Sequence, residues 1–449
     1  MHQRQLTRQP QGHILTNVGV WSRDGGWIVY DVRSDPAGSV FDGTRIERVS
    51  AHTGDVEILY ESQDGACCGV ATCSPADDRV VFIHGPERPT PNWQYAPYHR
   101  RGVIVDASRP GAGRNLDARD VTPPFTPGAL RGGSHVHVFS GDGQWVSFTY
   151  EDHVLAELHA QRPSEAKLDD QGAAVDRTAD ADLNQRNVGV SVPAGPVAVP
   201  RTHPRNHDGE FFSVLVTRTS NRPQPGSDEI GRAEGDAWVG TAGYLRADGT
   251  RQRRAIAFLG DVLDARGRPL SEVFIVDLPD DLTRPGDAPL EGTSVRRPAP
   301  PAGVAQRRLT FTADRRHPGV AGPRHWVRSS PLGSRIAFLM RDQGGVVQLW
   351  TVSPNGGEPE QVTHNPFDVA SAFSWHPQGT HIAYVGDGSV CLTTVASGGT
   401  RRLTPREPPE SAPRPEACVF SPDGTRIAYV RPVFHGGRAY NQVFIVELA

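Results

Sequence analysis

The chain has 449 residues, 37% of them hydrophobic, and a formal net charge of −4. This charge gives no basic surface for nucleic acid or for an anionic membrane, and no apolar stretch has the length of a membrane span. The first residues lack the apolar core of a secretory signal, so we expect a cytosolic protein. The 48 glycines and 39 prolines favour many short strands joined by turns.

In chain order, the first recurring feature is a turn phrase of the Ser-Pro-Asp-Gly type. Each copy consists of residues that favour type I and type II turns, and an apolar run typical of a strand follows it. The copies begin at Ser22, Ser74, Ser140, Ser330, His376 and Ser421. Apart from one wide gap after Ser140, neighbouring copies are about 45 to 65 residues apart, a spacing typical of the blades of a β-propeller.

A second phrase, Leu-Thr or Val-Thr, precedes most of these turns and predicts the outermost strand of each blade. It occurs at residues 5–7, 120–122, 308–310, 361–363 and 402–404. After Ser421 the sequence has only three predicted strands, whereas residues 5–7 stand before the first blade. We therefore expect the N-terminal strand to complete the last blade and close the ring.

The stretch between Ser140 and Ser330 is the least regular. Apolar runs at 211–216, 255–258 and 273–276 predict one more blade. The sequence thus predicts an all-β propeller of seven blades, or of six if this stretch forms none, in a single domain over 1–449. Polar insertions are expected at about 160–187, 219–252 and 279–306, either as functional lids or as solvated loops.

Histidines predict a site on one face of the propeller. Most of the 17 histidines fall in connections between blades or in loops after the second strand, which lie on the same face. His135, His137 and His325 begin innermost strands, and His135 and His137 should share one side of a strand because they are two residues apart. Together with Glu416, these imidazoles would bind a divalent metal such as Mn, Zn or Fe. The alternative is that they are ordinary hydrogen-bonded histidines.

Aromatic and arginine residues on the same face predict a binding surface. Trp93, Tyr98 and Arg100 lie in one proline-rich loop, and aromatic rings beside guanidinium groups suit sugar rings and carboxylates. The alternative is a loop that packs its own aromatic side chains. The predicted substrate contacts are Trp93, Tyr98, Arg100, Arg324, Asn17 and Glu416. The sequence has no nucleophile elbow, Walker loop or dinucleotide fingerprint, so a serine peptidase or a nucleotide cofactor is not expected.

The phrase at 421–429, with the paired Leu-Thr ends, resembles the TolB-type propeller family. The whole chain also resembles a YidR-like family of bacterial proteins with no assigned activity. The phrases that carry this second resemblance lie at 21–25, 28–34, 41–46, 131–138, 224–230 and 323–328.

A more distant resemblance is to oligogalacturonate lyase, a cytoplasmic propeller that holds a metal, typically manganese, through histidines and a glutamine. That enzyme cleaves uronate oligomers by β-elimination. The resemblance implies metal ligands among His135, His137, His207 and His325, a carboxylate clamp at Arg328 or Arg205, and a remaining imidazole, assigned to His207, as the base. The lyase has a glutamine three residues before its His-x-His, where this chain has Gly132.

Two functional hypotheses follow. The first is a metal-assisted lyase or hydrolase that acts on an acidic or modified sugar, and the one-sided histidines favour it. The second is a non-catalytic TolB-like propeller that binds a protein or a small ligand. A metal bound tightly and in stoichiometric amount would favour the lyase or hydrolase over the non-catalytic propeller.

Overall fold

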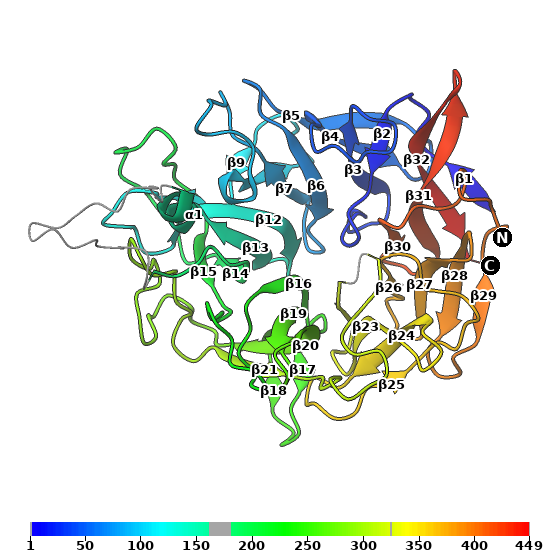
Figure 1. Ribbon diagram of the computed structural model, residues 1–449. Helices are drawn as coiled ribbons and strands as arrows, with labels where there is room; N and C mark the ends of the chain where they lie inside the picture. The colour runs from blue at the N-terminus through cyan, green and yellow to red at the C-terminus, as the bar shows by residue number, and fades with distance from the viewer. Residues whose placement is uncertain (1, 161–180, 324–325, 449) are drawn as a thin grey trace, which may run out of the picture.

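The computed structural model describes residues 2–160, 181–323 and 326–448. Seven four-stranded antiparallel sheets are arranged around a central axis as the blades of a propeller (Figure 1). The prediction of seven blades is confirmed. The prediction that an N-terminal strand closes the ring is also confirmed, because β1 (Gln3–Gln5) is the outermost strand of the last blade.

In blades 1 to 6 the chain runs from the innermost strand to the outermost. Blade 1 is β2 (Gly12–Ile14), β3 (Trp27–Arg33), β4 (Arg45–Ser50) and β5 (Val56–Glu61); blade 2 is β6 (Cys68–Cys73), β7 (Arg79–His84), β8 (Arg101–Asp106) and β9 (Arg114–Asn115). Blade 3 is β12 (Gly132–Phe139), β13 (Val146–Asp152), β14 (Asn187–Val192) and β15 (Phe212–Leu215); blade 4 is β16 (Ala233–Trp238), β19 (Arg254–Leu263), β20 (Pro269–Leu278) and β21 (Ala305–Arg308).

The last three blades have the same layout. Blade 5 is β22 (Arg328–Ser329), β23 (Ile336–Arg341), β24 (Val347–Val352) and β25 (Glu360–Gln361); blade 6 is β26 (Ser374–Trp375), β27 (His381–Gly386), β28 (Ser389–Thr394) and β29 (Thr400–Arg402). Blade 7 is, from the axis outward, β30 (Cys418–Phe420), β31 (Arg426–His435), β32 (Arg438–Glu447) and β1.

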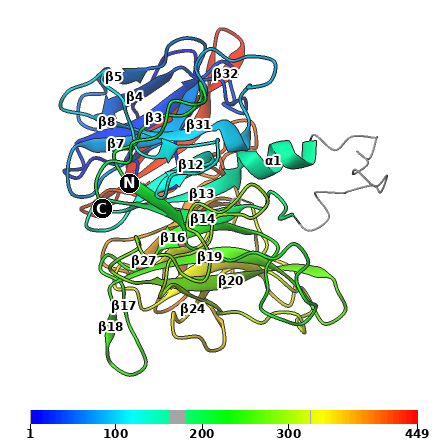
Figure 2. The same cartoon turned by 90° about the vertical axis from the view of Figure 1, so that its left-hand side faces the viewer.

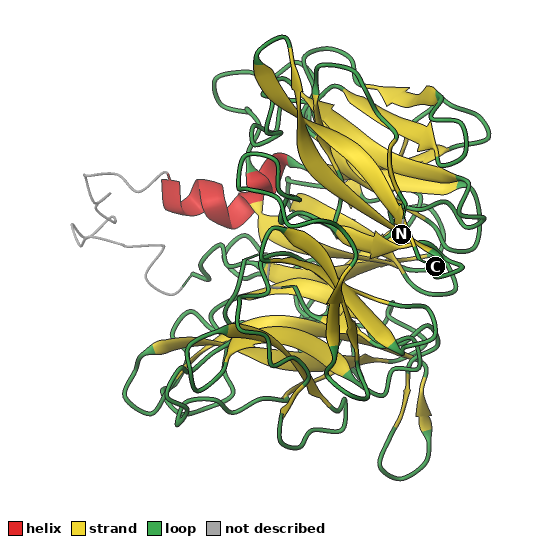
Figure 3. Cartoon of the chain, turned by 90° about the vertical axis from the view of Figure 1, so that its right-hand side faces the viewer, coloured by secondary structure: helices red, strands yellow, loops and turns green. Residues whose placement is uncertain are grey.

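The remaining elements lie in the connections. They are the 3₁₀ turn η1 (Pro97–His99), the parallel pair β10 (Ala118–Arg119) and β11 (Ala129–Leu130), the helix α1 (His153–Ala160), and the hairpin β17 (Tyr244–Leu245) and β18 (Arg251–Gln252). Seen from the side, α1 and the β17–β18 hairpin extend from opposite faces of the disc (Figures 2 and 3). In the described residues no helix is long and apolar enough to span a membrane.

The recurring turn owes its shape to a small set of hydrogen bonds. The Ser22 hydroxyl accepts a bond from the Trp27 backbone N–H (2.9 Å) and donates to the Asp24 carboxylate (2.5 Å). The same two bonds recur at Ser140 and Ser421. Each turn therefore starts the second strand of its blade in a fixed register, and apolar side chains of neighbouring blades pack together between the sheets.

The Leu-Thr phrase locks the outermost strand to the third strand. In blade 5, the Thr363 hydroxyl accepts a bond from the Leu349 N–H (2.9 Å) and donates to Gln348 Oε1 (2.6 Å). Thr7 and Thr310 make the same pair of bonds to their own third strands. The threonine recurs because its hydroxyl satisfies two buried groups at once.

Thr363→Val is therefore expected to lower the free energy of unfolding by about 1–3 kcal/mol, since the two buried groups lose their partner while the side-chain shape is kept. Denaturant titration monitored by fluorescence measures the change. Thr250→Val, at an exposed position of the β17–β18 hairpin, is the control and should change the stability by less than about 0.5 kcal/mol. Equal effects for the two variants would contradict this role of the buried hydroxyl.

The prediction for the central stretch needs three corrections. Residues 211–216 contain β15, the outermost strand of blade 3, and do not begin a further blade. The expected insertion at 219–252 contains β16, the innermost strand of blade 4, which pairs with β19 through a bulge. Residues 120–122 form no strand; the outermost strand of blade 2 is β9, earlier in the chain. Polar residues and a glycine within β16 hid its strand character.

Candidate functional site

Bulges in the innermost strands of blades 2 to 4 shape the wall around the axis. Val70 (φ 59°), Val136 (φ 55°) and Gly235 (φ 68°) adopt left-handed backbone conformations, and the strand register shifts at each of them. A β-branched residue at positive φ is an uncommon and strained conformation, and such strain concentrates at functional sites. The bulges therefore direct attention to the side chains next to Val136.

The bulge at Val136 places His135 and His137 on opposite faces of β12. His135 is paired with Thr149 across the sheet, whereas the His137 ring lies 6.2 Å from the ring of Phe148. The His137 Nε2 atom is 3.0 Å from the Ser134 hydroxyl, and the side chain is fully buried. The expectation that both histidines face the axis is wrong, because the extra residue of the bulge breaks the alternation of side chains.

His135 lies in a cavity that we call the axial pocket. It has a volume of about 270 Å³. The innermost strands of blades 3 and 4 contribute to its wall, together with Trp326 at the entry to blade 5. The lining includes His135, Val136, Thr149, Arg186, Glu234 and Trp326. A pocket of this size accommodates a small ligand such as one sugar ring.

A network of charged side chains lies in and around the axial pocket. Arg186 donates to Glu151 and to Glu234, at 2.6 Å in each case, and Arg232 also donates to Glu234. Arg100 is a further cation whose charge acts on His135. Of these charged groups, Arg186 and Glu234 line the pocket itself, one of each sign, and Arg100 and Arg232 add positive charge near it.

The His135 imidazole is neutral, and one of its ring nitrogens is buried without a hydrogen-bond partner among the described residues. Burial, followed by the positive charges of Arg100 and Arg186, holds the pKa of His135 well below its usual range. Within the described part of the chain its Nδ1 atom has no hydrogen-bond partner. A neutral imidazole with a free lone pair can accept a hydrogen bond or a proton, or bind a metal.

A pair of side chains from distant blades meets on the axis. Arg328, in blade 5, donates to the Asn17 side chain of blade 1 and to the Val327 carbonyl oxygen. The side chains of Arg328 and Asn17 are both buried. Burial lowers the pKa of Arg328 to about 10, and the charge of Asp236 opposes this shift. Burial likewise raises the pKa of Asp236, which accepts a bond from Thr149 (3.3 Å). Arg328 and Asn17 therefore lie near the predicted site, but they bond to each other.

The other predicted residues are dispersed. Trp93 and Arg205 line a second cavity, the rim pocket, and Tyr98 contacts its histidines. His207 lies in the loop between β14 and β15, where its backbone pairs with Arg119; burial, followed by the Arg119 charge, holds its pKa well below the usual range. It is not among the residues that line either pocket.

Three predicted positions remain. Glu416 precedes β30 and is half-buried. Arg324 and His325 lie outside the described residues.

Among the residues that the structure does describe, no three His, Cys, Asp or Glu side chains come together in a way that could hold a metal ion. Those residues alone therefore do not make up a metal centre.

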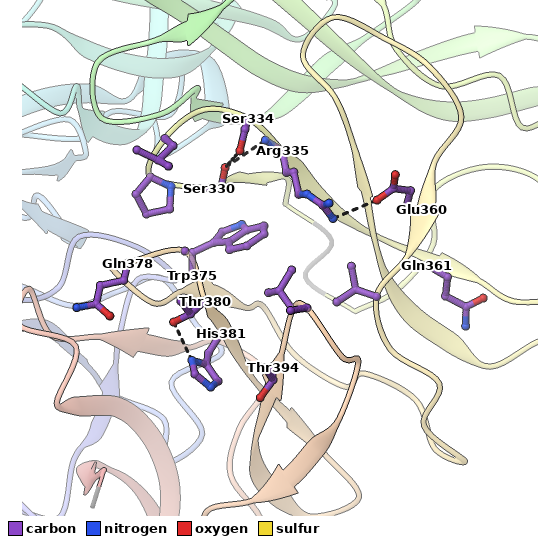
Figure 4. A pocket seen from close by; sticks show the side chains of 16 residues that line it. Ser330, Ser334, Arg335, Glu360, Gln361, Trp375, Gln378, Thr380, His381 and Thr394 are labelled. Carbon is purple, nitrogen blue, oxygen red and sulfur yellow. Dashed lines mark hydrogen bonds and ion pairs between the residues drawn. The ribbon is translucent and has the colours of Figure 1, made fainter.

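A third cavity, of about 730 Å³, lies on the opposite face, at the turns of blades 5 and 6. Trp375 and the Arg335–Glu360 ion pair (3.1 Å) lie within it, and His381 is beside Thr380 (Figure 4). None of the residues predicted from the sequence lines this cavity.

The sequence alone did not reveal Arg186 and Glu234 of the axial pocket. Arg186 directly precedes the apolar strand β14, and Glu234 lies in β16, within the stretch interpreted as an insertion. The only sign of them in the sequence was a charged residue next to a buried strand. The arrangement of the blades in a ring is what shows that Arg186 and Glu234 both face the axis.

The seven sheets around one axis, with a polar pocket between blades 3 and 4, define a seven-bladed β-propeller. The chain belongs to the family of the uncharacterized protein YidR of Escherichia coli (strain K12), to which it is 48% identical over 95% of this chain and 94% of that protein. A family model described as a protein of unknown function (DUF3748) matches residues 67–207, which include Trp93, His135 and His207.

Two solved structures of oligogalacturonate lyase share the fold at low sequence identity, and a third structure matches more weakly. A structure of oligogalacturonate lyase in complex with manganese has a TM-score of 0.58 and 11% identity, covering 100% of this chain and 93% of that one. Oligogalacturonate lyase from Vibrio parahaemolyticus has a TM-score of 0.53 and 11% identity, with the same coverage. A putative TolB from Agrobacterium tumefaciens has a TM-score of 0.39 and 12% identity, covering 90% and 98%.

Proposed function

We propose that this propeller is a lyase that acts on a small acidic or modified sugar in the axial pocket. The observation that carries the proposal is the neutral His135 imidazole, which lines the axial pocket beside Arg186 and whose buried Nδ1 atom has no hydrogen-bond partner among the described residues. The fold that the chain shares along its whole length with oligogalacturonate lyase is compatible with this proposal.

The residues of the pocket suit an elimination next to a carboxylate. The carboxylate of a uronate would pair with the guanidinium groups, of which Arg186 lines the pocket, and this pairing stabilises the negative charge that develops when the C5 proton leaves. The C5–H electron pair then forms the C4=C5 double bond, the C4–O bond breaks, and the leaving oxygen takes up a proton. His135 would accept the C5 proton or a hydrogen bond; its low pKa makes it a weak base, so charge stabilisation would have to supply much of the rate.

A divalent metal, Mn, Zn or Fe, is part of the proposal only as a condition to be tested, because the described residues do not supply three ligands. The purified protein is incubated with oligogalacturonates in the presence of each ion and in its absence. The ultraviolet absorbance of the new double bond, conjugated to the carboxylate, reports elimination. His135→Ala is expected to lower the rate by about 10²–10⁴-fold. His381→Ala, in the cavity on the opposite face, is the matched control and should retain the wild-type rate.

The alternatives give different results. New reducing ends without the double bond would indicate a hydrolase. Binding of the uronate without either product, or co-purification of a protein partner, would favour a non-catalytic propeller. Elimination that His135→Ala leaves unchanged would remove the axial pocket from the reaction.

A further inference from the structure

We propose that the rim pocket is a second binding site, which takes an uncharged, hydroxyl-rich ligand such as a neutral sugar. The cavity has a volume of about 810 Å³, within the usual range of small-molecule sites. Its lining includes Asn92, Trp93, His153, Glu157, His203 and Arg205. The inference does not depend on the lyase proposal, because it concerns a different cavity.

Three segments far apart in the sequence are bonded together around this cavity. They are the loop between β7 and β8, the start of α1, and the loop between β14 and β15. Arg205 donates from Nη1 to the Glu87 carbonyl oxygen (2.6 Å) and from Nη2 to that of Arg88 (2.9 Å), and its guanidinium lies 5.5 Å from the Trp93 ring. Arg205 thus holds two loops in place, so the cavity is a fixed part of the structure.

Hydrogen bonds determine which nitrogens of the histidines carry protons. The Gln94 carbonyl oxygen can only accept, so His99 Nδ1, 2.6 Å away, carries the proton and His99 Nε2 is an acceptor. His153 Nδ1, 3.1 Å from that Nε2, must then donate, which leaves His153 Nε2 as an acceptor. The Arg205 backbone N–H donates to His203 Nδ1 (3.1 Å), so His203 Nε2 carries a proton and is a donor.

Trp93 adds a second donor. Its side chain is 5% exposed, because the His99 ring stacks on it at 3.8 Å and the His153 ring lies edge-on at 4.4 Å. Its Nε1 atom has no hydrogen-bond partner in the parts of the chain that the structure describes. A buried indole N–H normally has a partner, so this atom indicates a missing acceptor at the cavity wall.

The charges around the rim pocket balance. Asp64 is paired with Arg88 (3.0 Å), and Glu87 with Arg101. Arg205 and Glu157 supply one further charge of each sign. Burial is the main cause that lowers the pKa of His99 to about 4 and that of His153 to about 3, so both imidazoles are neutral at neutral pH. Arg119, whose guanidinium lies 5.8 Å from the Trp93 ring, is a further cation, and the charge of Asp117 acts against it. The residues that line the rim pocket therefore carry no surplus charge.

Neutral donors and acceptors between aromatic rings suit sugar hydroxyl groups. Each hydroxyl both donates and accepts, so one sugar can bond to His153 Nε2 and to the N–H groups of His203 and Trp93. Strand β12 connects the two pockets. Its residue Gly132 is paired with Asp152, which precedes His153 of the rim pocket, and His135 of the axial pocket lies three residues after Gly132. The sites are thus about 10 Å apart along the strand.

The test uses cellobiose, lactose and maltose as neutral probes and glucuronate as the charged counterpart, with binding followed by ligand-observed NMR and titration calorimetry. We expect at least one neutral disaccharide to bind the full-length protein, and to bind at least about tenfold more weakly to both His203→Phe and His153→Phe. His203 is half-buried, so its substitution is expected to leave the fold intact, which circular dichroism checks. His135→Ala should bind the sugar like the wild type.

The pH dependence of binding is a second measurement. Burial is also the main cause that lowers the pKa of His203, so all three imidazoles are neutral at and above about pH 7, and affinity should change little between about pH 7 and about pH 8. The proposal is overturned if none of the three disaccharides binds at millimolar concentration, if binding survives both substitutions, or if glucuronate binds as tightly as the neutral sugars.

Discussion

Asp152→Ala is expected to lower the free energy of unfolding by about 3–5 kcal/mol, because it removes the partner of a fully buried cation. Asp152 accepts a bond from Arg131 Nε (2.8 Å) and another from the Tyr150 hydroxyl (3.0 Å). Arg131 is completely buried, and its guanidinium lies 4.9 Å from the Phe125 ring. Without the carboxylate, a positive charge would remain in the interior with no opposite charge in contact among the described residues.

The same carboxylate also fixes α1. Its Oδ1 atom accepts a bond from the Leu155 N–H (2.9 Å) in the first turn, so the variant loses a helix cap as well. Asp152→Asn keeps an acceptor for this N–H but not the charge, and should therefore lose most of the same stability. Denaturant unfolding of each variant measures the effects.

Glu61→Ala is the matched control, since it breaks an ion pair of similar length with Arg45 (2.9 Å) in which both side chains are exposed. An exposed pair contributes about 0–1 kcal/mol. A loss for Asp152→Ala no larger than that of the control would show that Arg131 finds another partner or reaches water.

Deletion of residues 2–7 is expected to destabilise the protein by about 5 kcal/mol or more. These residues include β1, whose backbone pairs with that of β32 from Phe444 to Val446. Leu6 is 4% exposed, and burial of such a side chain contributes about 2–3 kcal/mol. The Leu6 N–H to Val443 carbonyl bond (2.8 Å) and the Tyr429 hydroxyl to Gln3 bond (2.6 Å) each add about 0.5–1.5 kcal/mol.

The deletion also exposes the edge of β32, so light scattering should show aggregation that increases with concentration. A synthetic peptide of residues 1–8, added in excess, should bind this edge and restore the unfolding midpoint. Arg8→Ala changes an exposed residue just beyond the deleted segment, and its unfolding midpoint should match that of the wild type. A deletion variant with wild-type stability and no response to the peptide would show that ring closure adds nothing to stability.

The sequence predicted features whose cause is local. The turns at Ser22 and Ser140 are held by hydrogen bonds within a few residues, and Thr363 repeats the bonding of Thr310 in a neighbouring blade. Such patterns recur with the repeat, so the blades and the closure by the N-terminal strand could be predicted correctly.

The site depended on features that are not local. Nothing in the neighbourhood of Val136 indicates a left-handed backbone, yet that bulge separates His135 from His137. The resemblance implied that Arg205 is a carboxylate clamp beside the histidines of the axis, whereas it lies at the rim with His203, in a long loop between β14 and β15. Tertiary contacts decide both placements, and the spacing of residues along the chain does not encode them.

The bond between Arg328 and Asn17 limits the movement of a ligand along the axis. Blades 5 and 1 are not neighbours in the ring, so this buried pair spans the centre. A polymer cannot thread through the disc past it without breaking the pair. A ligand of the axial pocket is therefore expected to enter and leave by the same opening, which favours short molecules or chain ends over passage of a long chain through the disc.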